Sequence, residues 1–378
     1  MIYADHAATT PLAPQVLDAM LPYLKEQYGN ASSLYRLGRR SRQAIEDARK
    51  TVAALLGAIP AEVYFTSGGT EADNWALKGI ARKLADSGKR HIVTSSIEHH
   101  AVLNAAKALE KEGFTVTYLK PDRFGFISPE AVQAAVRPDT ALVSVMYANN
   151  EIGSVQPIGE IGAACREEGV LFHTDAVQAA GTLPIDVKAQ SIDLLSLSAH
   201  KFYGPKGVGV LFCRRGVFPQ NLLDGGSQEK GRRAGTENPA LIVGLAEALK
   251  LSYSGAEERI KHVAALRDRV QAGLLTIEGS RLNGGMEPRL PGIVNVSFSG
   301  IDGQSLLFQL DLDGVAASSG AACASGSVEP SHVLLALGVP YAQAHGSLRI
   351  SLGPENTAAD AEEIILAVKN AVTQLRNP

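Results

Sequence analysis

Short apolar runs alternate with longer amphipathic stretches along the chain from about residue 60. The apolar runs predict β-strands, and stretches in which apolar residues recur every three or four positions predict helices. Strands are expected at 62–68, 91–99, 141–153, 170–178, 193–201 and 207–215, and helices at 70–88 and 100–113. This alternation predicts an α/β fold with a mainly parallel sheet covered by helices on both faces.

The last third of the chain has a different pattern. Residues 238–275 are predicted as one long helical stretch, because this range contains no proline after Pro239. We expect this stretch to lead into a smaller α/β domain that begins near residue 255. Its expected elements are strands at 292–300 and 347–353 and a helix near 305–312. The predicted organisation is a large domain of residues 15–254 and a small domain of residues 1–14 and 255–378.

Composition narrows the class of protein. Of the 378 residues, 45% are hydrophobic and 20% are charged, as in ordinary globular proteins, and the formal net charge is -3. That charge provides no basic surface for nucleic acid or anionic membranes. Three cysteines cannot form a disulfide framework, and the start, MIYADHAATTP, lacks the features of a secretory signal. No apolar run reaches the roughly 18 residues of a membrane span, so we expect a cytoplasmic protein with reduced thiols.

Polar residues follow several of the predicted strands. In a parallel α/β sheet, ligands bind beyond the carboxyl ends of the strands, so these positions are the first candidates for a site. Lys201 is the last residue of the predicted segment 193–201 and comes directly after the strand-like part, in which Ser196, Ser198 and His200 alternate with apolar residues. Its amine could form an imine with an aldehyde cofactor such as pyridoxal phosphate, or it could be an ordinary solvated lysine. Lys206, in the following turn, is expected to face water.

The segment SGGTEAD at 67–73 joins a predicted strand to a helix. Gly68 and Gly69 would let the backbone approach an anion, and the helix N-terminus offers free N–H groups to a phosphate. Thr70 and Asp73 also have the spacing of a capping box, which is the purely structural interpretation.

Three further strand ends carry candidate groups. Asp175 could pair with a protonated pyridine nitrogen and Gln178 could donate to a phenolic oxygen, although an acid at a strand end is also a common helix cap. His99 could stack on a cofactor ring and move protons, although a histidine is more often structural. Asn149 and Asn150 could bind a ligand or only shape their turn.

Cys323 lies among Ala, Ser and Gly in the segment 317–338, without the bulky neighbours of a structural cysteine. A thiol there could act as a nucleophile if its pKa were lowered. Cys165 and Cys213 are expected to fill small spaces in the core. Cysteine and histidine spacings predict no metal site. Arg349, in an alternating strand, could hold a substrate carboxylate or form an ordinary surface ion pair.

Taken together, these segments resemble the pyridoxal-phosphate-dependent cysteine desulfurases of the nitrogenase and iron–sulfur cluster type. The resemblance rests on nine segments in order: YADHAATTP, SGGTEADN, IEHHAVLN, NNEIG, HTDAVQ, SLSAHKFYGPKGVG, RRAGTEN, SSGAACASGSVEPSHVLLALG and LRISLG. It implies the type I, aspartate-aminotransferase-like fold, with a large cofactor domain and a small domain, in a homodimer.

The resemblance also implies a role for each candidate. The implied cofactor contacts are Lys201 at the aldehyde, His99 on the ring, Asp175 and Gln178 at the ring nitrogen and oxygen, Asn150, and Gly69, Thr70, Ser198 and His200 near the phosphate. Thr236 is implied to reach the phosphate of the second chain. The implied substrate groups are Arg349 and Asn150 for the carboxylate and Cys323 for the sulfur.

The activity implied is conversion of L-cysteine to L-alanine, with the sulfur held as a persulfide on Cys323 and passed to an acceptor such as an iron–sulfur scaffold protein. The alternatives are a selenocysteine lyase, a transaminase or other lyase of the same fold, and a non-enzymatic scaffold. The sequence departs from the usual family pattern at Ala31, Tyr35 and His6. These departures leave substrate-pocket detail and the sulfur acceptor undetermined.

Overall fold

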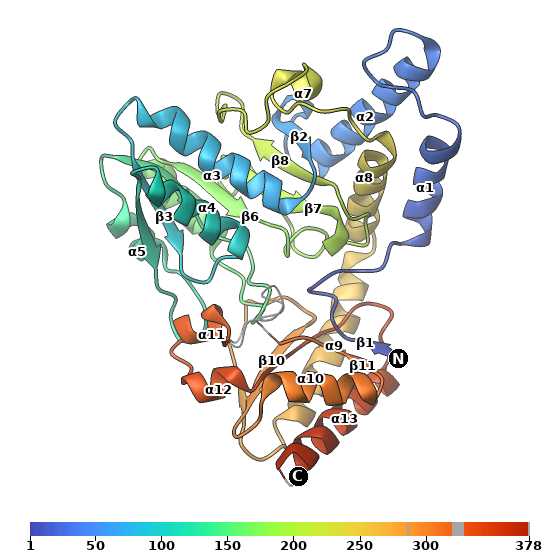
Figure 1. The fold of residues 1–378 in the computed structure, drawn as a ribbon, viewed down its shortest axis with the longest axis vertical. Coiled ribbons are helices and arrows are strands. Elements are labelled where there is room, and N and C mark those ends of the chain that lie inside the picture. The colour runs from blue at the N-terminus through green and yellow to red at the C-terminus, as the bar shows by residue number, and fades with distance from the viewer. Residues whose placement is uncertain (286, 320–328, 377–378) are drawn as a thin grey trace.

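The computed structural model describes residues 1–285, 287–319 and 329–376 (Figure 1). Cys323 lies outside the described residues. A seven-stranded sheet with its helices forms the upper part of Figure 1, and a smaller α/β unit that contains both chain ends forms the lower part.

The large sheet has the strand order β2-β8-β7-β6-β5-β3-β4. Its strands are β2 (Val63–Thr66), β3 (His91–Ser95), β4 (Thr115–Leu119), β5 (Thr140–Ser144), β6 (Leu171–Asp175), β7 (Leu194–Ser198) and β8 (Gly209–Cys213). The pairs β7–β6, β6–β5, β5–β3 and β3–β4 are parallel, which confirms the predicted mainly parallel α/β sheet. β8 runs antiparallel to both neighbours, because a short turn joins it to β7 and parallel strands need a longer crossover.

Helices cover both faces of this sheet. α1 (Pro14–Lys25), α2 (Arg36–Leu55), α5 (Pro129–Ala135), α6 (Ile158–Glu167) and α8 (Pro239–Tyr253) share a core with Phe65, Val93, Val143 and Leu195. On the other face, α3 (Gly69–Ala85) and α4 (His100–Lys111) share a core with the neighbouring strand residues Tyr64, Ile92, Leu142 and Leu194. Successive strand residues point to opposite faces, so each apolar run supplies both cores.

β4 is absent from the predicted strands. It is the edge strand of the sheet, its sequence is TVTYL, and four of its five residues are at least partly exposed. An edge strand with polar positions has no continuous apolar run to reveal it.

The small unit contains the antiparallel sheet β12-β10-β9 and the parallel pair β1-β11. Its strands are β1 (Ile2–Tyr3), β9 (Ser280–Leu282), β10 (Ile293–Phe298), β11 (Val315–Ala316) and β12 (Ser347–Ser351). Its helices are α9 (Ala256–Leu274), α10 (Gly303–Leu312), α11 (His332–Ala336), α12 (Tyr341–His345) and α13 (Ala358–Arg376). The strands at β10 and β12 and the helix at α10 confirm the C-terminal elements expected from the sequence.

The prediction of one helical stretch over 238–275 is wrong. α8 ends at Tyr253 and α9 begins at Ala256, and Gly255 between them has φ +63°. This left-handed conformation is easily reached by glycine but interrupts a right-handed helix, so one helix ends and the next begins there. The remaining short elements are η1 (Pro60–Glu62), η2 (Ala199–Lys201) and α7 (Gln228–Gly231).

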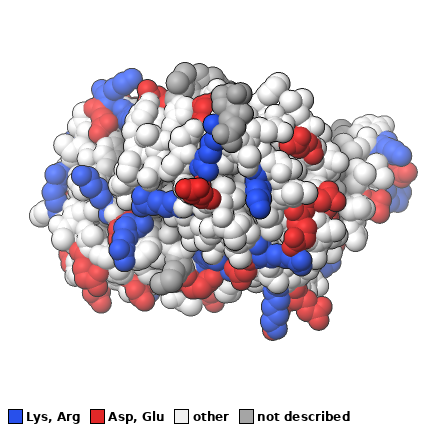
Figure 2. All heavy atoms as spheres, turned by 90° about the horizontal axis from the view of Figure 1, so that it is seen from below, with Lys and Arg blue, Asp and Glu red and all other residues white. Residues whose placement is uncertain are grey.

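Figure 2 views the molecule from below, from the side of the small unit. Lysine and arginine side chains are interspersed with aspartate and glutamate among the described residues of this face. Within the described parts of the chain, no helix is long and apolar enough to cross a membrane.

Candidate active site

A cavity of about 270 Å³ lies at the carboxyl ends of β6 and β7 and is closed on one side by β12 of the small unit. Its position agrees with the general location of ligand sites in open α/β sheets. The predicted site residues that line it are Gly69, Thr70, His99, Asn150, Asp175, Gln178, Ser198, His200, Lys201 and Arg349. These residues come from segments far apart in the sequence, and the fold brings them together.

Lys201 is the last residue of the short turn η2 and lies three residues after Ser198, where β7 ends. The strand therefore ends before His200, and the predicted alternation does not extend to it. The Lys201 Nζ donates to the carbonyl oxygens of Ala7 and Ala8, at 2.6 and 2.7 Å. The N-terminal segment thus holds the amine at the wall of the cavity. Lys206 is exposed, as expected.

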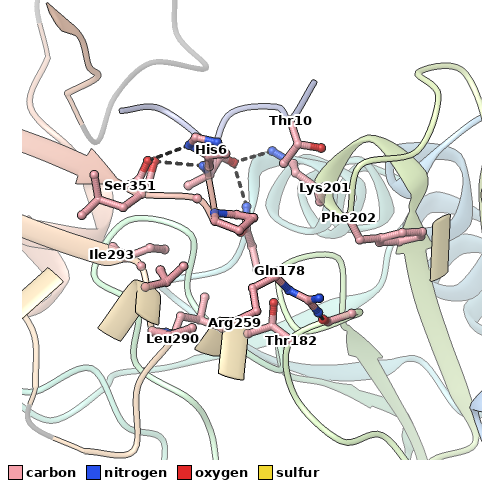
Figure 3. A pocket seen from close by; sticks show the side chains of 18 of the residues that line it. His6, Thr10, Gln178, Thr182, Lys201, Phe202, Arg259, Leu290, Ile293 and Ser351 are labelled. Atoms are coloured by element: carbon pink, nitrogen blue, oxygen red, sulfur yellow. Dashed lines mark hydrogen bonds between the residues drawn. The ribbon is translucent and has the colours of Figure 1, made fainter. Parts of the chain in front are cut away.

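A second cavity, of about 100 Å³, lies on the other side of Lys201 and Gln178 (Figure 3). The dashed lines in Figure 3 from these two side chains meet at the carbonyl of Ala7, which accepts from Gln178 Nε2 at 2.9 Å and from Lys201. His6 of the same segment approaches the carbonyl of Ser351, with Nδ1 at 3.2 Å. Residues 6–8 therefore form a wall between the two cavities and link it to β12.

The N-terminus of α3 reaches the first cavity, but the predicted capping box at Thr70 and Asp73 is wrong. The helix begins at Gly69, its N-cap is Gly68, and no side chain caps it. A Cβ atom on Gly69 would lie 2.7 Å from Val177, so only glycine lets this end of the helix pack so closely. The first backbone N–H groups are left for a ligand.

Asp175 and Asp73 bring two carboxyl groups to the cavity lining. Burial raises the pKa of Asp175 to about 6, against the opposing effects of the Val177 N–H, at 2.9 Å, and the Lys201 charge. Burial and the charge of Asp175 raise the pKa of Asp73 well above its usual value. One oxygen of Asp73 lies 3.7 Å from Nε2 of His173 and has no hydrogen-bond partner in the described part of the chain. Buried carboxylates without full compensation favour a cationic ligand group.

His99 lies at the start of α4, where its Nδ1 accepts from the backbone N–H of Ala101 at 3.1 Å. Burial, with the charge of Lys201 as the next cause, lowers the pKa of His99 to about 4. Burial lowers the pKa of His200 to about 4 as well. Both rings are therefore neutral at pH 7, and the proton of His99 is on Nε2 because Nδ1 accepts a hydrogen bond.

Arg349 is only 3% exposed, so the interpretation as a surface ion pair is wrong. Its Nη2 donates to Asp5 at 2.8 Å and its Nη1 to the carbonyl of Asn150 at 3.0 Å. Its Nε is buried and has no hydrogen-bond partner among the residues that the structure describes. A guanidinium held from two sides at a cavity wall, with one donor unpaired, suits the binding of a carboxylate.

Thr236 is the described residue among the predictions that does not line the cavity. Thr236 is exposed on the loop before α8, and Cys323 lies outside the described residues. Cys165 and Cys213 are free and buried, which confirms them as core residues. Burial raises the pKa of Cys165 to about 12 and that of Cys213 further, so neither is a ready nucleophile. Among the described residues, no three His, Cys, Asp or Glu side chains cluster as a metal site would require.

Sequence reasoning assigned no site role to several groups that the fold places here. Asp5, Ala7 and Ala8 come from the N-terminal segment, and only tertiary packing shows that they hold Arg349 and Lys201. Glu98 is buried and accepts a hydrogen bond from the backbone N–H of Met146 at 2.9 Å. Burial raises the pKa of its carboxyl group to about 8. The sequence signal that could have drawn attention to Glu98 is its position directly after Ile97, within the predicted strand 91–99.

The comparisons with known proteins agree with this geometry. The family model for class-V aminotransferases matches residues 2–364. A cysteine desulfurase IscS of Methanosarcina thermophila is 54% identical over 376 residues, which cover 100% of this chain and 93% of that protein. A cysteine desulfurase IscS of Clostridium botulinum is 51% identical over 99% of this chain and 95% of that protein.

Solved structures give the same result. A NifS-like protein matches over 100% of both chains with a TM-score of 0.92 and 38% identity. The structure of SspA in complex with cysteine covers 94% of this chain and 100% of its own, with a TM-score of 0.83 and 38% identity. The chain therefore belongs to the class-V aminotransferase family and, within it, to the cysteine desulfurases.

Proposed function

We propose that this protein removes sulfur from L-cysteine with the help of pyridoxal phosphate, releasing L-alanine and leaving a persulfide on Cys323. The observation that carries the proposal is a single cavity lined by the amine of Lys201, the buried carboxyl of Asp175 and the guanidinium of Arg349. Support also comes from the relatives named cysteine desulfurase and from the neighbour SspA, which was solved in complex with cysteine.

The residues of the cavity fit pyridoxal phosphate. The cofactor carries a phosphate, a ring nitrogen that can be protonated and an aldehyde. The N-terminus of α3 has no side-chain cap, and its free backbone N–H groups suit the phosphate. The buried, poorly compensated carboxyl of Asp175 suits the protonated ring nitrogen, and the amine of Lys201 suits the aldehyde.

We assign the cofactor contacts accordingly. Lys201 would hold the aldehyde, Asp175 the ring nitrogen and Gln178 the phenolic oxygen, while His99 would lie on the ring. The groups assigned to the phosphate side are Gly69, Thr70, Ser198 and His200, with Thr236 of the second chain and Asn150 beside the ring. When bound, the cofactor supplies a ring that accepts the electron pair left when a substrate carbon loses its proton.

The protein's own groups then have separate tasks. Arg349 binds and orients the substrate carboxylate through charge-assisted hydrogen bonds. We assign proton transfer during the reaction to His99, whose ring is neutral at pH 7 before substrate binds because burial lowers its pKa to about 4. The thiolate of Cys323 attacks the substrate sulfur, so an S–S bond forms as the substrate C–S bond breaks, and the substrate carbon takes up a proton to become L-alanine.

The wider organisation is proposed with the activity. We assign residues 15–254 to a large cofactor domain, and residues 1–14 and 255–378 to a small domain that carries Cys323. We propose a homodimer, since Thr236 does not line the cavity of its own chain. We also propose a cytoplasmic location and transfer of the persulfide sulfur to an acceptor such as an iron–sulfur scaffold protein.

The test is alanine formation from L-cysteine with excess reductant, comparing the wild type with Cys323→Ala and Lys201→Ala. We expect alanine from the wild type and almost none from either variant. Lys206→Ala is the matched control, because it removes an exposed amine from the following turn. Its activity and its absorbance from bound pyridoxal phosphate should match the wild type.

Each failure has a separate meaning. Equal alanine from Cys323→Ala would remove the persulfide step and leave a lyase of another mechanism. Equal alanine from Lys201→Ala would remove the proposed cofactor attachment. Absence of alanine from a wild-type protein that binds pyridoxal phosphate would reject L-cysteine as the substrate.

A further inference from the structure

Residues 227–238, which comprise the short element α7 and the chain that follows it up to α8, form a loop that carries Thr236 and is held to the rest of the chain at two places. Thr236 is exposed and does not line the cavity of its own chain. The proposed function places this residue at the phosphate of the second chain in a dimer. The loop must therefore have a defined shape before the second chain can use it, and its contacts show how that shape is maintained.

The base of the loop has a strained backbone. Glu229, Lys230 and Gly231 have φ values of +45°, +61° and +72°, so two residues with side chains adopt the left-handed conformation in succession. This conformation is unfavourable for residues other than glycine and persists only where other contacts enforce it. Here the contacts are those of Arg49 on α2, which donates to both carboxylate oxygens of Glu229 at 2.7 Å.

Further bonds secure this base. Glu229 also accepts from the backbone N–H of Phe65 at 2.9 Å, and Arg49 donates to the carbonyl of Val63 at 2.8 Å. Both charged side chains are 3% exposed. The strained turn is thereby fixed to β2, the edge strand that leads into the 67–73 segment.

The outer half of the loop is fixed by a second ion pair. Arg233 donates to both oxygens of Glu71, from Nε at 2.8 Å and from Nη2 at 3.0 Å. Glu71 also accepts from the backbone N–H of Ser67 at 2.7 Å. Gln228 accepts from the backbone N–H of Gly235 at 3.1 Å, one residue before Thr236. Burial alone would raise the pKa of Glu71, but the hydrogen bonds from Arg233 and Ser67 outweigh it, so the pKa is lowered.

Glu71 connects this loop to the cavity of its own chain. It lies in the first turn of α3, directly after Thr70, and both Gly69 and Thr70 line the cavity. The same helical turn therefore faces the phosphate end of one site and, through Glu71, holds the loop proposed to reach the other site. A two-bond arginine–carboxylate pair transmits orientation as well as charge.

We propose that Glu71 and Arg233 are positioning residues that hold Thr236 in the conformation needed at the second chain's cofactor site, and so couple the two sites of the dimer. This inference rests on the proposed function, since it requires the homodimer and the cofactor. Loss of the pair in one chain weakens cofactor binding in the other chain, not in its own.

Mixed dimers test this direction of action. In the first dimer, a Lys201→Ala chain is combined with an Arg233→Ala chain. The only site with Lys201 then belongs to the Arg233→Ala chain and receives the intact loop of its neighbour. In the second dimer, a chain with both substitutions is combined with a wild-type chain, so the only site with Lys201 receives the altered loop. The two dimers have the same composition of substitutions.

The readouts are the affinity of the Lys201-containing site for pyridoxal phosphate, followed by absorbance, and alanine formation. We expect the first dimer to bind like the wild type with about half its activity. We expect the second dimer to bind about tenfold more weakly, as for loss of one hydrogen bond to a charged group. A purely structural role of Arg233 would affect both dimers alike, so only their difference supports the proposal.

The matched control is Arg82→Ala in both arrangements. Arg82 also lies on α3 and also makes a two-bond pair, with Glu112 at 3.0 and 2.7 Å, but at the opposite end of the helix. Its two mixed dimers should bind the cofactor equally well.

The contrary outcomes are distinct. Equal affinity in the two Arg233 dimers, or weaker binding in the first, would overturn this inference while leaving an active wild-type dimer and the proposed function intact. A wild-type protein that sediments as a monomer with full activity would overturn both the inference and the proposed dimer. A dimer that forms no alanine but still shows the expected affinity difference would reject only the proposed activity.

Discussion

Arg49 and Arg349 are 2% and 3% exposed, but their surroundings differ. Arg49, behind the large sheet, donates to both oxygens of Glu229, to Glu46 and to the carbonyl of Val63. Arg349, at the cavity, donates to Asp5 and to one carbonyl, and within the described parts of the chain its Nε has no hydrogen-bond partner. Equal burial therefore accompanies a fully bonded arginine in one region and an incompletely bonded one in the other.

The difference separates a structural role from a ligand-binding role. A buried charge without full compensation destabilises the folded protein, so it persists where a ligand supplies the missing partner. The same contrast holds for carboxyl groups. Both oxygens of Glu229 accept hydrogen bonds, whereas one oxygen of Glu98 and one of Asp73 have no partner among the described residues. Asp73 lines the cavity and Glu98 directly precedes His99, which also lines it.

The largest effect is expected from Arg49→Ala. It would leave Glu229 buried without its partner, and breaking a buried ion pair in this way costs about 3–5 kcal/mol of unfolding free energy. The measurement is denaturant unfolding of the protein. The control is Arg82→Ala, whose pair with Glu112 is more than one-third exposed and should contribute at most about 1 kcal/mol. Similar losses for both variants would contradict a special structural role for Arg49.

Arg349→Ala should act mainly on catalysis. Removing charge-assisted hydrogen bonds to the substrate carboxylate should lower kcat/KM for L-cysteine by about 100-fold, equivalent to 2.7 kcal/mol. The loss of unfolding free energy should be smaller than for Arg49→Ala. Steady-state alanine formation and denaturant unfolding of the same preparation provide both values. A variant with normal kcat/KM but severe instability would make Arg349 a structural residue like Arg49.

Asp5→Asn should have a smaller and more selective effect. Asp5 accepts from Arg349 Nη2 at 2.8 Å, so loss of its charge should loosen the orientation of the guanidinium. We expect KM for L-cysteine to rise about tenfold with little change in kcat, as for one hydrogen bond to a charged group. The affinity for pyridoxal phosphate should be unchanged. A fall in kcat at unchanged KM would instead indicate that Asp5 acts on the reaction step.

Glu98 permits a test by pH. Its pKa is raised from 4.5 to about 8, so between these values the folded protein keeps a proton that the unfolded chain releases. The unfolding free energy therefore falls as pH rises through this window. In Glu98→Gln this contribution is absent. The unfolding free energy of the variant should therefore fall by about 1 kcal/mol less between pH 7 and pH 8 than that of the wild type.

Denaturant unfolding of the cofactor-free proteins at both pH values measures this difference. Glutamine keeps an acceptor for the bonds from Ser95 and Met146, so the variant tests the titration more than the packing. Parallel stability curves for the two proteins would show that Glu98 ionises normally, like a fully compensated carboxyl group.

Local pattern predicted the elements in which adjacent residues carry enough information. The strands β3, β6 and β7 and the helices α3 and α4 were expected at their observed places, although each predicted strand extends three or four residues past the observed end. The prediction failed where tertiary context decides: at the polar edge strand β4, at the break at Gly255, and at Thr70 and Asp73. Asp73 faces the cavity because its helix packs against the sheet, which local capping statistics do not include.

The sequence alone indicated the fold class and most of the residues that line the cavity, because hydrophobic periodicity depends on neighbouring residues and strand ends in a parallel sheet meet at one edge. The family was indicated separately, by the resemblance of nine motif segments to the cysteine desulfurases. Only the tertiary structure decided which groups hold the candidates in place: the carbonyls of Ala7 and Ala8 at Lys201, Asp5 at Arg349, and Glu71 at Arg233. These contacts join segments up to 344 positions apart, and burial then sets their charges and pKa values, which no local pattern records.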